Sequence, residues 1–286
     1  MKLAQVLRDA QTRIAQVSGS ARLDAQLLLA HALGVDRTYV IAHGERELTA
    51  EELAAFAPLV ERAVNAEPIP YILEKRAFFD RELYVNHDVL IPRPETELLL
   101  ERALEWTKTH PVRLAADIGT GSGALAVTYC ALIKLAKVYA TDISAEALAV
   151  ARKNAEQFGL LDRLTLIQGD LAAPLIERGI KLDLLMANLP YIPTEIITTL
   201  APNVREYEPR VALDGGSDGM ALIRRLIGQI SLVCQPDALI LLEIGMDQEA
   251  AVRELAGAIP GARVTHFTDY AGLDRIVQIE LSPTSS

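Results

Sequence analysis

Short, nearly continuous apolar runs alternate with segments of helical pattern from residue 113 to the end of the chain. Apolar runs of this kind are typical of parallel strands that helices cover on both faces. Strands that alternate with helices predict a doubly wound α/β domain. We expect seven strands, at Arg113–Ile118, Lys137–Thr141, Leu164–Gln168, Leu182–Ala187, Ala238–Ile244, Arg263–Phe267 and Arg275–Leu281.

The connection before the last expected strand is short. It spans only Asp269–Asp274, whereas a parallel neighbour requires a crossover of about a dozen residues or more. The last strand is therefore predicted to run antiparallel to its neighbour.

The first 67 residues have only helical patterns, and Pro68-Ile-Pro70 then marks a boundary. Arg22–Leu33 is strongly apolar and ends at Gly34, a residue type that commonly stops helices. Thr49 and Glu52 have the spacing of a capping box at the start of a further helix. Residues 1–75 are therefore predicted to form a small helical domain.

A connector is expected between the helical and α/β domains. Ala77–Ile91 alternates apolar and polar residues around Asp80-Arg81, which is typical of a hairpin. We interpret residues 76–92 as a β-hairpin linker. Residues 93–286 then form the α/β domain, which opens with a helix at Pro94.

Charge and hydropathy restrict the partners and the location of the protein. The formal net charge is −10, and an acidic surface repels phosphate backbones, so stable nucleic-acid binding is not expected. No stretch reaches the roughly 20 apolar residues that a membrane helix requires. The start of the chain, Met1–Ala10, lacks the apolar block of a signal peptide. A cytoplasmic protein is therefore expected, and its scattered histidines and two cysteines predict no metal site.

A glycine-rich loop, Asp117-Ile-Gly-Thr-Gly-Ser-Gly123, follows the first expected strand of the α/β domain. Glycines let the backbone turn sharply and approach a ligand, and N–H groups at the start of the next helix are expected to face that ligand. The third glycine comes one residue too early for the dinucleotide pattern. The loop therefore favours a sulfonium amino acid over a pyrophosphate. NAD binding by a divergent loop is the competing interpretation.

Acidic residues follow the next two strands. Asp142 ends the second strand, where a carboxylate can accept hydrogen bonds from both ribose hydroxyls. Asp170 follows the third strand and can accept from an adenine amino group. These acceptors predict an adenosine that lies across the carboxyl edge of the sheet. The alternative is that they cap helices, since Asp142 precedes Ser144, a plausible helix start.

The segment Asn188-Leu-Pro-Tyr191 follows the fourth strand. A carboxamide nitrogen is a poor nucleophile, and acceptors that hold its N–H groups orient it and stabilise the developing positive charge. The Asn188 side-chain oxygen and the Leu189 carbonyl are suitable acceptors. Pro190 favours an extended Leu189, and Tyr191 can stack on a planar amide. The segment therefore predicts methylation of an amide nitrogen without a general base. The alternative is that its Asn and Pro only shape the turn that follows the strand.

Three segments resemble one family, the release factor glutamine N5-methyltransferases (the HemK-like group). Val89–Glu97 is similar to the family's hallmark segment, Asp117–Gly123 to its cofactor loop, and Glu208–Gly216 to a later loop. The resemblance extends over essentially the whole chain. It implies a Rossmann-like seven-stranded methyltransferase domain, a helical substrate-docking domain and S-adenosylmethionine as the donor. The implied substrate is the glutamine in the Gly-Gly-Gln loop of peptide chain release factors.

The resemblance also implies roles for individual residues. Asn188 and Tyr191 would be catalytic, and they would hold the substrate glutamine together with Leu189 and Pro190. Leu189 stands where the family usually has proline, and Leu171 stands where an aromatic residue often lies near the adenine. The cofactor-binding residues that we expect are Asp117, Gly119, Thr120, Gly121, Ser122, Gly123, Asp142, Asp170, Leu171 and Asn188.

Two other functions are left open by the sequence. Asn-Leu-Pro-Tyr also resembles a motif of ribosomal RNA adenine dimethyltransferases, so adenine N6 methylation of RNA or DNA is an alternative. A non-catalytic cofactor-binding partner protein is the other. The family segments and the acidic composition favour the protein substrate. Arg93, Glu95 and Glu97 either orient the substrate or form ion pairs and cap the helix, and the sequence favours neither interpretation.

Overall fold

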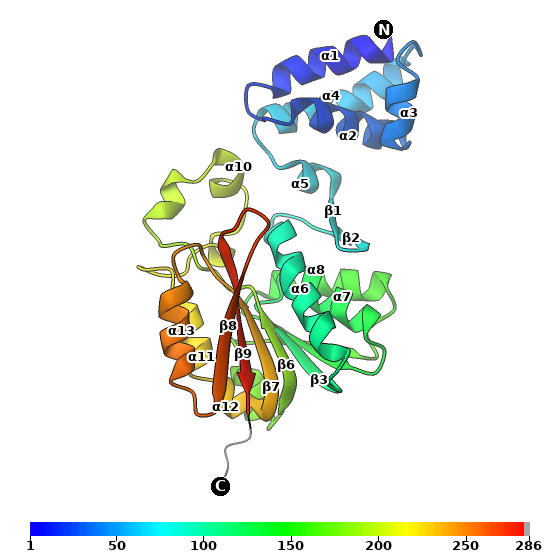
Figure 1. Cartoon of the computed structure of the whole chain (residues 1–286). Coiled ribbons are helices and arrows are strands. Elements are labelled where there is room, and N and C mark those ends of the chain that lie inside the picture. The colour runs from blue at the N-terminus through cyan, green and yellow to red at the C-terminus, as the bar shows by residue number, and fades with distance from the viewer. Residues whose placement is uncertain (283–286) are drawn as a thin grey trace. The chain divides into compact units, whose positions relative to one another are not determined.

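A computed structural model describes residues 1–282 of the chain, which divides into two compact units (Figure 1). The helical unit consists of Met1–Lys75 and Ala201–Tyr207. The α/β unit consists of Arg76–Leu200 and residues 208–282. Among residues 1–282, no helix is both long enough and apolar enough to cross a membrane.

The helical unit packs short helices around an apolar core that includes Leu28 and Phe56. The capping box is present, because the Thr49 side chain accepts a hydrogen bond from the Glu52 amide and the Glu52 side chain accepts one from the Thr49 amide. The Tyr207 hydroxyl donates to the Asn65 carbonyl oxygen at 2.8 Å and ties the later segment to this unit. The helices are α1 (Leu3–Ile14), α2 (Ala21–Leu33), α3 (Arg37–Ala42), α4 (Ala50–Val64), α5 (Ile69–Leu73) and α10 (Pro202–Arg205).

One large sheet forms the centre of the α/β unit, and within residues 1–282 it has seven strands in the order β5-β4-β3-β6-β7-β9-β8. The strand β9 runs antiparallel to both of its neighbours. The predicted fold class and the antiparallel last strand are therefore confirmed. The strands are β3 (Leu114–Ile118), β4 (Lys137–Asp142), β5 (Leu164–Gln168), β6 (Leu182–Ala187), β7 (Cys234–Glu243), β8 (Ala262–Thr268) and β9 (Asp274–Leu281).

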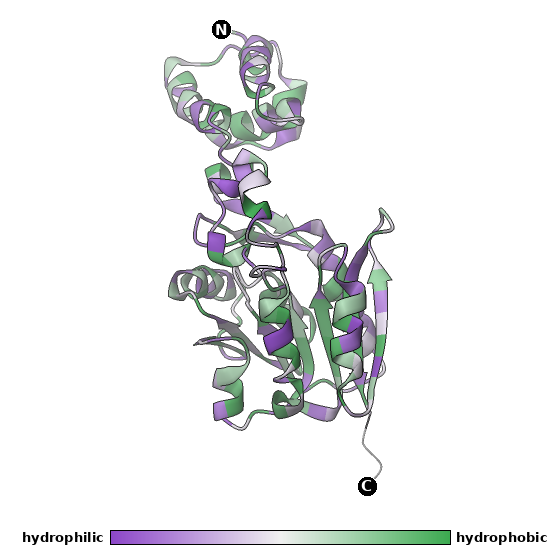
Figure 2. Ribbon diagram, turned by 90° about the vertical axis from the view of Figure 1, so that its left-hand side faces the viewer, coloured by the Kyte–Doolittle hydropathy of each residue, from purple (hydrophilic) through white to green (hydrophobic). Residues whose placement is uncertain are grey.

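Helices cover both faces of the sheet (Figure 1). The central strands are hydrophobic over most of their length, as burial on both faces requires (Figure 2). One face carries α6 (Pro94–Thr107), α7 (Ala124–Leu132) and α8 (Ala145–Gln157). The other carries α9 (Ala173–Glu177), α11 (Ala221–Ile227), α12 (Ile230–Val233) and α13 (Glu249–Gly257). Two 3-10 turns, Ile196–Thr199 and Arg210–Ala212, lie in the loops.

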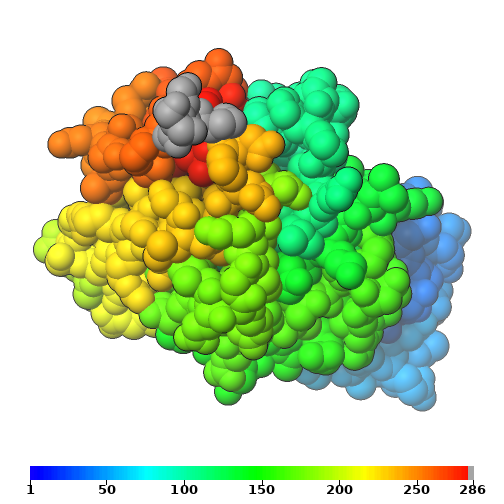
Figure 3. Space-filling view, turned by 90° about the horizontal axis from the view of Figure 1, so that it is seen from below, coloured from blue at the N-terminus to red at the C-terminus, as the bar shows by residue number. Residues whose placement is uncertain are grey.

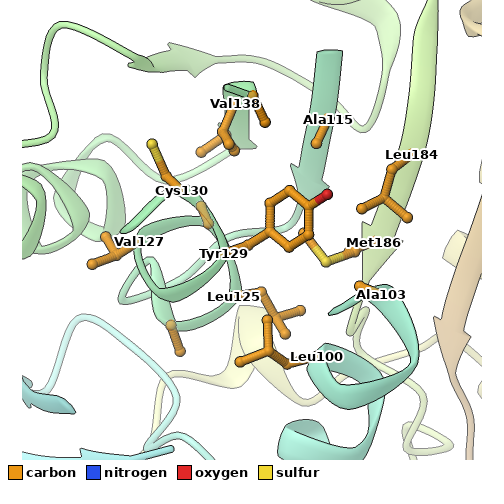
Figure 4. Packing of buried hydrophobic residues seen from close by; sticks show 14 of the residues in the cluster. Leu100, Ala103, Ala115, Leu125, Val127, Tyr129, Cys130, Val138, Leu184 and Met186 are labelled. Atoms are coloured by element: carbon orange, nitrogen blue, oxygen red, sulfur yellow. The ribbon is translucent and has the colours of Figure 1, made fainter. Parts of the chain in front are cut away.

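The α6 face has a dense core around Tyr129 (Figure 4). Leu100 of α6 and Leu125 of α7 lie beside the Tyr129 ring, with Met186 of β6 close by. The Tyr129 hydroxyl is satisfied by the Thr107 hydroxyl at 2.8 Å. Seen from below, the teal surface of α6 lies beside the red surface of β9 (Figure 3). The core thus joins α6 firmly to the sheet.

The position of β3 in the sheet creates a crevice. This strand pairs in parallel with β4 on one side and with β6 on the other. The connection that follows β3 and the connection that follows β6 therefore run in opposite directions from the carboxyl ends of these strands. Ligands of open α/β sheets bind at such a switch point. The glycine loop follows β3 and Asn188 follows β6, so both lie at this point.

The predicted hairpin is present but shorter than expected. Its strands are β1 (Lys75–Phe78) and β2 (Arg81–Tyr84), whereas pairing was expected to extend to Ile91. The second strand ends early because the Asn86 side chain accepts a hydrogen bond from the Asp88 amide at 3.1 Å, which closes a turn.

Asn154 of α8 connects this hairpin to the glycine loop. Its side-chain oxygen accepts from the Tyr84 amide at 2.7 Å. Its side-chain nitrogen donates to the carbonyl oxygens of Tyr84 and Ser122 at 2.9 and 2.8 Å. The side chain is fully buried, so water does not compete for these hydrogen bonds in the folded protein.

We predict that Asn154→Ala lowers the free energy of unfolding by about 3 kcal/mol, because it leaves three partly or fully buried backbone groups unpaired. The matched control is Gln157→Ala on the same helix, which removes one exposed hydrogen bond to the Glu82 carbonyl of the hairpin. That change should stay within about 0.5 kcal/mol. Urea titrations measure both, and equal effects would contradict the connecting role of Asn154.

Candidate active site

A cavity of about 560 Å³ opens at the carboxyl edge of the sheet in the α/β unit. This volume is typical of small-molecule sites. The loops that follow β3, β4, β5 and β6 line it, together with the segment before α6. The predicted site residues on its wall are Asp117, Gly119, Thr120, Gly121, Ser122, Asp142, Asp170, Leu171, Asn188, Leu189 and Pro190.

The glycine loop needs glycine at Gly119 for two reasons. Its φ is +74°, a region that other residues rarely adopt. A Cβ atom there would also lie 3.0 Å from Cδ2 of Leu189. The Leu189 side chain is buried. It therefore packs over the loop from the neighbouring strand end, and this packing is its contribution at the position where proline is usual.

The amides of Gly119, Thr120 and Gly121 are engaged within the protein. Those of Gly119 and Thr120 both donate to the Thr141 carbonyl oxygen at 2.9 Å. The Gly121 amide donates to the Asp142 side chain, also at 2.9 Å. These loop amides therefore find acceptors on β4. The loop contributes shape instead of these donors. The expectation that amides at the start of α7 face a ligand stays a prediction, and Ala124 and Leu125 of that helix do line the cavity.

Gly123 is not among the residues that line the cavity. It caps α7 with φ +81°, and a Cβ atom there would lie 3.1 Å from Val127 and 3.2 Å from Ala151 of α8. Its location indicates close packing of α7 against α8.

Asp117 is almost completely buried beneath the loop. Its carboxylate accepts from the Thr120 hydroxyl at 2.7 Å and from the Ala126 amide at 3.1 Å. Burial raises the pKa of this carboxyl to about 7, although both hydrogen bonds act in the opposite direction. The side chain therefore fastens the loop to the first turn of α7.

Asp142 accepts backbone hydrogen bonds on both carboxylate oxygens. Oδ2 accepts from the Gly121 amide and Oδ1 from the Ser144 amide, both at 2.9 Å. Each oxygen has a second lone pair, so acceptor capacity is left for a ligand. Burial raises the pKa of this carboxyl. Ser144, and not Asp142, caps α8, because its hydroxyl accepts from the Ala147 amide at 3.0 Å.

Asp170 and Leu171 lie on the cavity wall after β5. The Asp170 carboxylate forms an ion pair with Arg225 of α11, a partner that the sequence did not indicate. Leu171 has φ +51° and a buried side chain. Its carbonyl oxygen accepts from the Thr141 hydroxyl at 2.9 Å, which holds this turn against β4.

A chain of hydrogen bonds runs from Asn188 into the core. The Asn188 side-chain nitrogen donates to the Thr96 hydroxyl oxygen at 2.9 Å. That hydroxyl donates to Glu243 Oε2 at 2.6 Å, and the Tyr191 hydroxyl donates to Glu243 Oε1 at 3.3 Å. Tyr191 is not among the residues that line the cavity, so its stacking on a substrate stays a prediction.

Thr96 and Glu243 were missed by reasoning from the sequence. Thr96 lies inside the segment Val89–Glu97 that carries the family resemblance. Glu243 is the last residue of β7 and follows a continuous apolar run, and Asp117 is the last residue but one of β3. An acidic residue at the end of an apolar strand could have indicated a site residue.

Arg93 forms an ion pair with Glu208 at 2.5 Å, and the Glu208 side chain is buried. The same carboxylate accepts from the Ile91 amide at 3.3 Å. Two of the segments that carry the family resemblance therefore meet at this pair. Glu95 and Glu97 lie in the first turn of α6, where negative charge suits the helix dipole. No cluster of three metal-ligating side chains occurs among the described residues.

Comparison with protein families gives two matches. Residues 5–73 match the PrmC N-terminal domain, and residues 94–213 match the ribosomal protein L11 methyltransferase family (PrmA).

Two curated relatives carry the same name. A release factor glutamine methyltransferase of Moorella thermoacetica is 42% identical over 96% of this chain and 97% of its own length. One from Caulobacter vibrioides is 40% identical over 92% of this chain and 91% of its own length.

Solved structures agree in fold. A methyltransferase from Pyrococcus furiosus superposes with a TM-score of 0.52 at 19% identity, over 73% of this chain and 92% of that one. The hMettl16 catalytic domain in complex with MAT2A 3'UTR hairpin 6 gives 0.55 at 18% identity, over 71% and 76%. At these identities the likeness concerns the fold alone.

We predict that Asp117→Asn changes how stability depends on pH. The folded-state pKa of Asp117 is raised from 3.8 to about 7, so its contribution is fully present below pH 4 and is lost as pH rises through 7. Asparagine does not titrate and can accept the same two hydrogen bonds. The free energy of unfolding of the variant, relative to the wild type, should therefore increase by at least about 1 kcal/mol between pH 5 and pH 8. Urea titrations at several pH values measure this difference, and a constant difference would contradict the assignment.

Proposed function

This chain belongs to the family of release factor glutamine methyltransferases, and on that premise we propose that it methylates the side-chain nitrogen of a glutamine. The methyl donor in this proposal is S-adenosylmethionine, and the substrate is the Gly-Gly-Gln loop of a peptide chain release factor. The observation that carries the proposal is the position of Asn188. It lies on the same cavity wall as the glycine loop and Asp142, so an acceptor for a substrate amide is close to the expected donor site.

The shape and chemistry of the cavity fit S-adenosylmethionine. The cradle at Gly119 would be filled by any Cβ atom, and the remaining lone pairs of Asp142 suit two ribose hydroxyls. The exposed Ile143 and the buried Leu171 supply apolar surface for a base on the same wall. Arg225 already pairs with Asp170, so an adenine amino group would share that carboxylate with a cation. When bound, this cofactor supplies an electrophilic methyl group on a positively charged sulfur.

Asn188 and Leu189 have the chemistry to hold a glutamine side chain. The nitrogen of Asn188 is engaged by Thr96, which leaves its Oδ1 as an acceptor for one substrate N–H. The Leu189 carbonyl can accept from the other N–H, since Leu189 also lines the cavity. Two acceptors fix the nitrogen in line with the methyl group and stabilise the positive charge that develops on it. The proton then leaves to water, so no general base is needed.

The Gly-Gly-Gln loop fits such a site because glycine has no side chain that would clash at the cavity mouth. A single glutamine offers little contact area, so further affinity has to come from elsewhere in the release factor. We assign this docking role to the helical unit, of which residues 5–73 match the PrmC N-terminal domain.

A methylation assay with labelled donor tests the proposed substrate. Purified release factor should accept label, and its variant with Gly-Gly-Ala in the loop should not. Bare ribosomal RNA should also stay unlabelled. Label on the RNA with none on the release factor would replace the proposal with adenine methylation. Label on neither, with intact cofactor binding, would favour a non-catalytic partner protein.

We predict that Asp142→Ala weakens binding of S-adenosylmethionine by about 1.5–3 kcal/mol, the range for hydrogen bonds to a charged group. The matched control is Asp218→Ala. Asp218 pairs with Arg224 and is not among the cavity-lining residues, so this change should leave the affinity unchanged. Titration calorimetry measures both, and melting curves confirm that each variant is folded. Unchanged affinity in a folded Asp142→Ala protein would remove Asp142 from the site.

A further inference from the structure

The side-chain amide of Asn188 can point in two ways, and only one of them suits the proposed reaction. Its oxygen and nitrogen have nearly the same shape, so hydrogen bonds alone decide which of them faces the cavity. If the nitrogen faced the cavity, its N–H groups would meet the N–H groups of a substrate glutamine. Donor would then face donor, and the substrate nitrogen would not be held.

Thr96 is the neighbour that selects between the two orientations. A hydroxyl group has one proton to donate and can also accept. The Thr96 proton is used toward Glu243 Oε2 at 2.6 Å, so toward Asn188 the Thr96 oxygen can only accept. Asn188 must then present its nitrogen to Thr96, at 2.9 Å, and its oxygen is left for the cavity.

Glu243 sets the donor-to-acceptor direction of these hydrogen bonds. Its side chain is buried at the end of β7, and an ionised carboxylate can only accept. It accepts from Thr96 on one oxygen and from the Tyr191 hydroxyl, at 3.3 Å, on the other. Both donors therefore turn their protons toward Glu243, and the order of donors and acceptors is fixed out to Asn188.

From this arrangement we propose that Glu243 and Thr96 are positioning residues that orient the Asn188 amide for methyl transfer. The inference rests on the proposed function for the identity of the reaction. It assigns roles to two residues that do not touch the substrate nitrogen, and it makes the ionisation of Glu243 a requirement for turnover.

Several groups around Glu243 act on its charge. Arg275 of β9, itself paired with Asp269 at 3.1 Å, favours the carboxylate, and so do the hydrogen bonds from Thr96 and Tyr191. Glu95 of α6 and burial oppose it, and burial has the largest effect, so that the pKa of Glu243 is raised to about 7. A protonated Glu243 can donate to Thr96. The Thr96 hydroxyl is then free to donate to the Asn188 oxygen, and the amide turns its nitrogen to the cavity.

The sign of the pH dependence follows from this reversal. The ionised form of Glu243 is the active one, so kcat should rise with pH through about 7 and then level off. Between pH 6 and pH 8 the rise should be roughly tenfold, since one group with this pKa changes from mostly protonated to mostly ionised. Glu243→Gln should have a kcat that is flat over this range, because glutamine does not titrate.

The test measures kcat and KM for whole release factor, with saturating S-adenosylmethionine, in the wild type and in four variants of the full chain. Glu243→Gln should lose the acid limb of the pH profile on the same substrate, which excludes titration of the release factor as its cause. Thr96→Val should lower kcat by about tenfold or more through misplacement of Asn188, with KM and cofactor affinity little changed. Thr96→Ser keeps the hydroxyl and should restore kcat to within about threefold.

The matched control is Thr107→Val on the same helix, which removes a partly buried hydroxyl that bonds to the Tyr129 hydroxyl. Its kcat and pH profile should match the wild type. A flat wild-type profile, an acid limb that persists in Glu243→Gln, or equal kcat in Thr96→Val and Thr96→Ser would overturn the inference. In each of these cases the wild type still methylates release factor. Failure of the proposed function is distinct, because the wild type itself would then transfer no label.

Discussion

The parallel pairing of β3 with β4 on one side and β6 on the other is the constraint on which the rest of the α/β unit depends. It places Gly119, Asp142 and Asn188 at the ends of three adjacent strands, although they are far apart in the chain. It also supplies the Thr141 carbonyl oxygen that accepts from two amides of the glycine loop. The cavity is therefore a direct result of strand order.

Two buried carboxyl groups stiffen this edge of the sheet. Asp117 fastens the loop to α7 through Thr120 and Ala126, and Glu243 gathers the hydroxyls of Thr96 and Tyr191. Burial raises the pKa of both groups to about 7, so each costs stability when ionised. The residues that donate hydrogen bonds to these acids belong to packed helices and strands. The acids therefore hold neighbouring residues in place, and neither transfers a proton to or from the substrate in the proposed reaction.

The glycine loop illustrates how far local reasoning reaches. Its conformation was predictable, since the alternate glycines all adopt positive φ angles. The direction of its amides was not, because their acceptors belong to β4 and not to a ligand. The same holds for the hairpin. Its turn at Asp80-Arg81 was predictable from the sequence, but its early end at Tyr84 depends on a hydrogen bond of the Asn86 side chain. Each difference arises where a backbone group finds a nearby acceptor or donor other than the expected one.

The sequence by itself determined the fold class, the helix caps at Gly34 and Thr49, and the set of polar residues at the strand ends. These features depend on residues that are close in the chain, whose periodicity and spacing are visible without a structure. Only the tertiary structure decided which side chains meet. Thr96 reaches Glu243 across 147 residues and Arg93 reaches Glu208 across 115. Such pairs exist because strand order and the packing of α6 bring distant segments together, and no local pattern records that order.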